Sequence, residues 1–73
     1  MKKRFNSFMR LNEFDSVRIL KDDGGIIKKG DIGVILVVFE NPREAYEVEV
    51  FDENGKPKAQ GTFLPDDLEL VKY

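Results

Sequence analysis

The sequence predicts an all-β fold, a small and partly open SH3-like barrel of about five antiparallel strands with a one-turn 3-10 helix before the last strand. Short segments alternate apolar and polar residues with the period of two that a half-buried strand requires. Turn-forming Gly, Asn, Asp and Pro residues separate these segments. The chain has 73 residues, and a sheet that curls on itself lets few residues enclose one core. The competing predictions are a plain meander and an OB-type barrel, which usually has a longer helix.

The first strand is expected over residues 16–20, where apolar and polar residues alternate. In the short segment before it, Leu11 and Phe14 are expected to turn one apolar face inward. A long polar connection with Gly-rich turns follows. Within this connection, Ile26 and Ile27 are expected to return to the core.

Residues 33–40 are rich in β-branched side chains and are expected to form a central strand that is covered on both faces. Asn41-Pro42 then predicts a turn. The next strand, residues 45–51, shows the clearest alternation in the chain. Its expected inward residues are Tyr46, Val48 and Val50, and its expected outward residues are Glu47 and Glu49.

Asn54-Gly55 is a strong hairpin signal, so the following strand, residues 56–64, is expected to pair with residues 45–51. Gly61 is expected to mark a bulge or bend in this strand. Residues 65–67 then predict the single helical turn, and residues 68–71 predict the last short strand.

The composition argues against catalysis and metal binding. The chain has no Cys and no His, and therefore no thiolate nucleophile, no imidazole base and neither of the usual zinc ligands. The segment Gly30-Asp31-Ile32-Gly33 precedes a strand, whereas a phosphate-binding glycine loop opens a helix, so we expect a tight turn there. Neighbouring carboxylates alone do not give the separation that acid/base catalysis needs. We expect no enzyme, no catalytic residue, no cofactor and no metal site.

Charge is divided unevenly along the chain. Residues 1–10 form a basic N-terminal arm with four Lys and Arg residues and no acid, and the barrel domain is expected over residues 11–73. The remaining 63 residues carry 8 basic and 14 acidic side chains, a net charge of −6. Such a domain repels phosphate backbones, so nucleic acid is expected to bind only through the arm. The longest apolar run, residues 34–39, is too short to span a membrane, and we expect a cytoplasmic protein.

Three stretches carry a resemblance to a known family: Lys28 to Ile35, Ala45 to Val50 and Thr62 to Val71. Together they resemble a family of small uncharacterised bacterial proteins of about this length, a domain of unknown function, over residues 11–72. The pattern is also similar, more loosely, to SH3-like folds such as KOW domains, the photosystem I subunit that helps dock ferredoxin, and the nitrile hydratase beta subunit. These resemblances imply a barrel that binds something and is not catalytic by itself.

Acidic residues are the main candidates for partner binding. The first group is expected to converge on one rim of the barrel and comprises Asp22, Asp23, Glu40, Glu44, Asp66 and Asp67. Phe51 shares a strand face with Glu47 and Glu49, and it is the aromatic residue most expected to be exposed. An acidic surface of this kind favours fast and specific association with a cationic partner.

The leading functional hypothesis is a non-enzymatic module that neutralises or docks another protein, as an antitoxin or an immunity protein does. One alternative is KOW-like RNA or ribosome binding through residues 1–10. Another is an accessory subunit of a larger enzyme. A free strand edge allows pairing between copies, so a monomer or a weak homodimer is expected.

Overall fold

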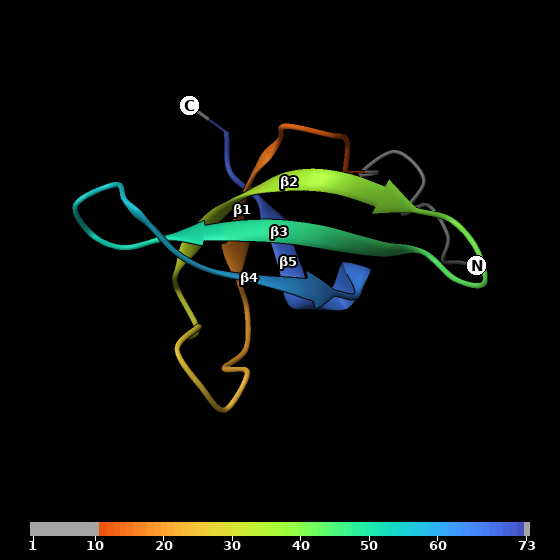
Figure 1. The fold of residues 1–73 in the computed structure, drawn as a ribbon. Helices are drawn as coiled ribbons and strands as arrows, with labels where there is room; N and C mark the ends of the chain where they lie inside the picture. The colour runs from red at the N-terminus through yellow and green to blue at the C-terminus, as the bar shows by residue number, and fades with distance from the viewer. Residues whose placement is uncertain (1–10, 73) are drawn as a thin grey trace.

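The computed structural model describes residues 11–72, and they form five antiparallel strands and one 3-10 helix (Figure 1). The elements are β1 (Ser16–Ile19), β2 (Ile32–Phe39), β3 (Ala45–Phe51), β4 (Pro57–Phe63), the 3-10 helix η2 (Pro65–Asp67) and β5 (Leu68–Leu70). This architecture confirms the predicted all-β class, the number of strands and the helical turn before the last strand. The predicted basic arm, residues 1–10, lies outside the described residues.

The strands form one open sheet in the order β4-β3-β2-β1-β5. Consecutive strands from β1 to β4 pair with each other, and β5 returns to the free edge of β1. The sheet is strongly bent, so that β1 and β5 pass behind the other strands in the view of Figure 1. Within residues 11–72, no ladder joins β4 to β5, so both keep an outer edge. In the same range, no helix is long and apolar enough to cross a membrane.

The core lies on the concave side of the sheet. The register places Val48 of β3 opposite Ile35 of β2, and Tyr46 opposite Val38. Tyr46, Val48 and Val50 are completely buried, as their alternation with two glutamates predicts. The remaining buried apolar residues are Leu11, Val17, Ile19, Ile27, Ile35, Ala45, Phe63 and Leu68.

Gly33 allows β2 and β3 to approach each other closely. A Cβ atom at this position would lie 2.6 Å from Val48 Cγ1 and 2.7 Å from the carbonyl oxygen of Glu49. Both contacts are too short for any side chain, so the backbones approach closely only because residue 33 is glycine. Glycine was predicted to allow the tight turn before β2, and Gly33 also allows close packing within the strand itself.

The bulge predicted at Gly61 lies elsewhere. Gly61 pairs regularly with Val48, and the register of β4 shifts between Ala59 and Pro57, which leaves Lys58 as the extra residue. Gly61 is small for a different reason, because a Cβ atom there would lie 3.3 Å from the ring of Phe63. A second register shift occurs in β2, where Leu36 is the extra residue.

Three expectations about apolar side chains are wrong. Strand β2 is not covered on both faces, because Val37 and Phe39 keep 39% and 40% of their surface exposed. Phe14 does not face inward; it is 73% exposed and has a φ angle of 70°. Of the two isoleucines in the long connection, Ile27 is buried as expected, but Ile26 is exposed. These errors arise because the side chain that faces the core depends on turns and bulges that apolar composition does not reveal.

Candidate functional site

The predicted acidic rim is divided between separate parts of the sheet. Asp22 and Asp23 lie in the connection that enters β2, whereas Glu40 and Glu44 lie in the turn that leaves it (Figure 1). The whole of β2 separates these two pairs. Asp67 is next to the entering connection, because its carbonyl oxygen accepts a hydrogen bond from the Leu20 amide at 2.8 Å. Among residues 11–72, no three acidic side chains are grouped closely enough to hold a metal ion.

Several of these acids hold the backbone in place. Asp22 accepts a hydrogen bond from the Lys29 amide at 2.6 Å, and Asp23 accepts one from the Gly25 amide at 2.6 Å. These bonds fix the β1–β2 connection. Asp67 is 3.7 Å from the Lys21 ammonium group. Asp commonly bonds to backbone amides in Gly-rich turns, so the sequence was compatible with these roles but did not distinguish them from a binding surface.

Glu44 accepts a hydrogen bond from the Tyr46 hydroxyl group, which is the polar end of a fully buried side chain. Glu40 is exposed at the end of β2, and Asp66 is exposed in η2. Neither of these two residues lies beside Glu47 or Glu49 in the strand register. The strongest candidate surface therefore lies on the sheet itself.

Strands β2 and β3 present a mixed apolar and acidic surface to the outside of the sheet, which we call the outer face. Paired residues share a face, so the register assigns it directly: Val37 lies opposite Glu47, and Val34 lies opposite Glu49. The outer face comprises Ile32, Val34, Val37 and Phe39 of β2 with Glu47, Glu49 and Phe51 of β3. It brings together the three predicted partner-binding residues of β3 and adds an apolar row that the sequence analysis had assigned to the interior.

The bulge at Leu36 creates the exposed half of this row. Before the bulge, Ile35 points into the core, and after it Val38 does so. The inward position is therefore shifted by one residue, which turns Val37 and Phe39 outward. The pairing of this segment with a strand that alternates Glu and Val was the available signal, because residues opposite a glutamate share its exposed face.

Negative charge on the outer face is not compensated within residues 11–72, where no basic side chain forms an ion pair with Glu47 or Glu49. Glu47 instead accepts hydrogen bonds from Thr62 Oγ1 at 2.6 Å and Gln60 Nε2 at 2.9 Å, both on β4. Arg18, on the outward side of β1, is paired with Glu69 of β5 at 2.8 Å. Glu47 thus lies beside the exposed Val37 and is oriented by neutral groups, and Glu49 lies beside the half-buried Val34.

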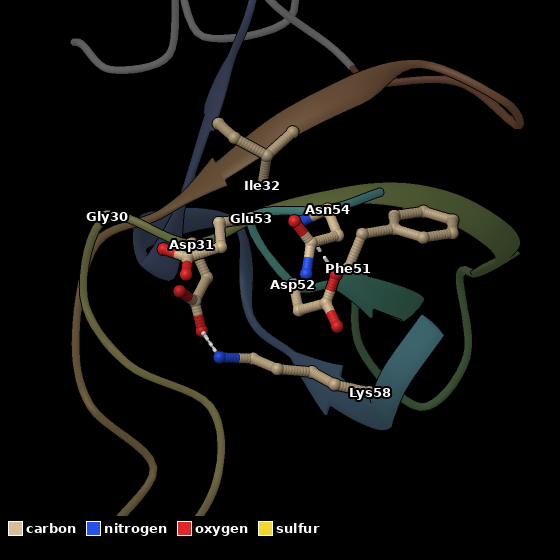
Figure 2. A pocket seen from close by; sticks show the side chains of 8 residues that line it. All are labelled: Gly30, Asp31, Ile32, Phe51, Asp52, Glu53, Asn54 and Lys58. Carbon is tan, nitrogen blue, oxygen red and sulfur yellow. Dashed lines mark hydrogen bonds and ion pairs between the residues drawn. The ribbon is translucent and has the colours of Figure 1, made fainter. Parts of the chain in front are cut away.

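Phe51, expected to be the most exposed aromatic residue, is half-buried, and Phe14 and Phe39 are both more exposed. It lies at the edge of an open pocket of about 410 Å³ between the start of β2 and the β3–β4 hairpin (Figure 2). Figure 2 shows Asp31 and Lys58 directed at each other across this pocket, 2.7 Å apart.

Three of the charged side chains that line the pocket, Asp31, Lys58 and Asp52, are engaged within the fold. Burial acts to raise the pKa of the Asp31 carboxyl group, but hydrogen bonds from Lys58 and from the Lys28 amide outweigh it and leave the pKa below its usual value. Asp52 accepts hydrogen bonds from the amides of Asn54 and Lys56. The ion pair joins β4 to the turn before β2, and Asp52 stabilises the β3–β4 hairpin, so the pocket is a structural junction.

The profile of one protein family, the domain of unknown function DUF4926, matches residues 13–70. The match covers all five strands and leaves residues 1–10 outside, in agreement with the resemblance noted in the sequence. No curated protein and no solved structure matches the chain at a significant level. The matched range spans most of the chain, and the chain therefore belongs to the DUF4926 family.

Proposed function

We propose that this chain is a small, non-enzymatic module of the SH3-like type that binds another protein through its outer face. The observation that carries the proposal is the exposed pair Val37 and Phe39 beside Glu47, which has no basic partner in residues 11–72. Exposed apolar side chains bordered by oriented polar groups are typical of protein interaction surfaces.

The position of the outer face in the sheet supports this proposal. It lies on β2 and β3, which are both long strands paired on two sides. A binding surface on such strands is rigid before the partner arrives, so less conformational entropy is lost on binding. We further propose that the bound partner is neutralised or docked, as by an antitoxin or an immunity protein.

Capture of binding partners from the native host tests the proposal, provided that a variant of the outer face is compared with the unchanged chain. A tagged full chain is compared with Val37→Asp, which places a charge in the apolar row, and with Glu53→Lys, which changes the charge of the exposed β3–β4 turn outside this face. We expect the unchanged chain and Glu53→Lys to retain one stoichiometric protein after nuclease treatment, and Val37→Asp to lose it. Thermal unfolding of each variant checks that the fold is intact.

Two outcomes would contradict the proposal. The first is a partner that Val37→Asp retains fully, because the outer face would then play no part in binding. The second is the recovery of RNA or ribosomal proteins that disappear with nuclease, which would favour the KOW-like alternative.

A further inference from the structure

We infer that the element bound by the outer face is an amphipathic, basic α-helix of the partner protein. This inference rests on the proposed function and adds the chemistry and secondary structure of the partner. Three observations carry it: the hydrogen bonding of β2 and β3, the spacing of the side chains on the outer face, and the uncompensated charge of its glutamates.

The backbone of the outer face is already engaged. Strand β2 pairs with β1 and β3, and β3 pairs with β2 and β4, so neither strand offers a free row of amide and carbonyl groups. An extended peptide lying across this face would lose water from its own backbone groups without gaining partners. A helix satisfies its backbone internally and needs only side-chain contacts.

Strand addition at the edge of the sheet is the competing arrangement, and β4 is poorly suited to it. This edge strand begins with Pro57, which has no amide donor, and continues with Lys58, the extra residue of a bulge. Proline and bulges are both features that protect an edge from pairing. Strand β5, at the other edge, has only three residues.

The side-chain spacing fits a helix that lies along β2. Val37 and Phe39 are two residues apart on one strand, a separation of about 6.8 Å, and Glu47 and Glu49 repeat this spacing on a strand about 4.8 Å away. Glu47 lies opposite Val37, and Glu49 lies opposite Val34 on the other side of the bulge. Residues four apart on a helix are separated by about 6 Å along its axis. A helix whose apolar stripe covers Phe39, Val37 and Val34, with Lys or Arg residues four apart on the flank next to Glu47 and Glu49, therefore matches both rows.

Charge complementarity determines that the flank is basic. Glu47 and Glu49 have no basic partner within residues 11–72, and the two hydrogen bonds from β4 hold Glu47 in place. A cation at this position gains an ion pair beside an apolar contact, and an acidic residue there would be repelled. The same charges select against a second copy of this face, because glutamates would meet glutamates.

An NMR titration of the isotopically labelled full chain with two synthetic peptides tests the inference. One peptide contains only Leu and Lys, arranged with helical period so that Leu forms one stripe. The other has the same composition in an order that gives no stripe. We expect the first peptide to shift the amide signals of β2 and β3, to gain helical circular dichroism on binding, and to bind at least about tenfold more tightly than the second.

Variants of the full chain assign the contact. Glu47→Gln combined with Glu49→Gln should weaken binding of the helical peptide about tenfold and reduce its salt dependence. Glu53→Gln, which removes one negative charge outside the outer face, is the matched control and should leave the affinity unchanged.

Four results would overturn the inference. The two peptides could bind equally, or the shifted amide signals could be concentrated on the edge of β4 or on the Asp22–Asp23 connection. The amide signals of the outer face could also depend on protein concentration, which would indicate a second copy. Replacement of the basic residues of segment 1–10 by Gln supplies a further check. If this replacement changes the amide signals of the outer face in the absence of peptide, segment 1–10 is what binds the outer face. If capture of the host partner depends on Val37 while the helical peptide fails to bind, the proposed function stands and the helix inference fails.

Discussion

Lys58 Nζ lies 2.7 Å from Asp31 Oδ2, and this ion pair joins the bulge of β4 to the turn that begins β2. Both side chains are mostly buried, at 24% and 20% exposure. Asp31 also accepts a hydrogen bond from the Lys28 amide at 2.8 Å. One carboxylate therefore fixes its own turn and connects it to a strand that is distant in the sequence.

This arrangement predicts a pH dependence of stability. The folded-state pKa of Asp31 is below its ordinary value of 3.8, so the stabilisation is fully present above that value and is lost as the pH falls through the folded pKa. Asp31→Asn should reduce the free energy of unfolding by no more than about 1 kcal/mol at neutral pH, because the pair remains partly solvated. Urea unfolding of both proteins at pH 7 and pH 3 measures the free energy of unfolding and its change with pH.

The difference between the unchanged chain and Asp31→Asn should shrink toward pH 3. Glu53→Gln, at an exposed carboxylate, is the control and should show no such convergence. A constant difference across this pH range would mean that the carboxylate charge is not the source of the stabilisation.

Gly33→Ala should destabilise the fold by about 3 kcal/mol or prevent folding, because the new methyl group would overlap Val48 and the Glu49 carbonyl group. Thermal unfolding measures the change. Gly25→Ala is the matched control, since a Cβ atom there meets only Asp23 Oδ1 at 3.5 Å. Equal effects at the two positions would show that the β2–β3 approach is not as tight as the structure indicates.

Asp52→Ala should cost about 1 kcal/mol of stability, because the Asp52 carboxylate accepts hydrogen bonds from the Asn54 amide at 2.8 Å and the Lys56 amide at 3.0 Å. Glu53→Ala, at the next residue, removes an exposed carboxylate that accepts neither bond and should be nearly neutral. Chemical denaturation of both variants provides the comparison. An unchanged midpoint for Asp52→Ala would indicate that Gly55, with its φ angle of 83°, suffices to define the hairpin.

Phe14→Asn should stabilise the protein by about 0.5 to 1 kcal/mol. Phe14 is the third residue of the turn closed by the Asp15 amide and the Asn12 carbonyl group, and its φ of 70° is strained for an aromatic residue. Asn tolerates this conformation better, and little apolar burial is lost because Phe14 is 73% exposed. A lower melting temperature for Phe14→Asn would show that the exposed ring makes a stabilising contact.

The sequence by itself determined the parts of the fold that depend on neighbouring residues. The alternation in β3 identified its buried side chains, Asn54-Gly55 located the hairpin, and Pro65 marked the 3-10 helix. Period, proline and glycine act over a few residues, so their effects can be predicted without knowing the rest of the chain.

Only the tertiary structure decided which residues form the outer face. One bulge at Leu36 shifts the inward position of β2 by one residue, so Val37 and Phe39 point outward beside Glu47 although the apolar run itself shows no break. The acids of the β1–β2 connection proved to bind backbone amides, which composition alone does not distinguish from a binding surface. Register and pairing depend on contacts between distant residues, and these contacts arise only when the sheet has formed.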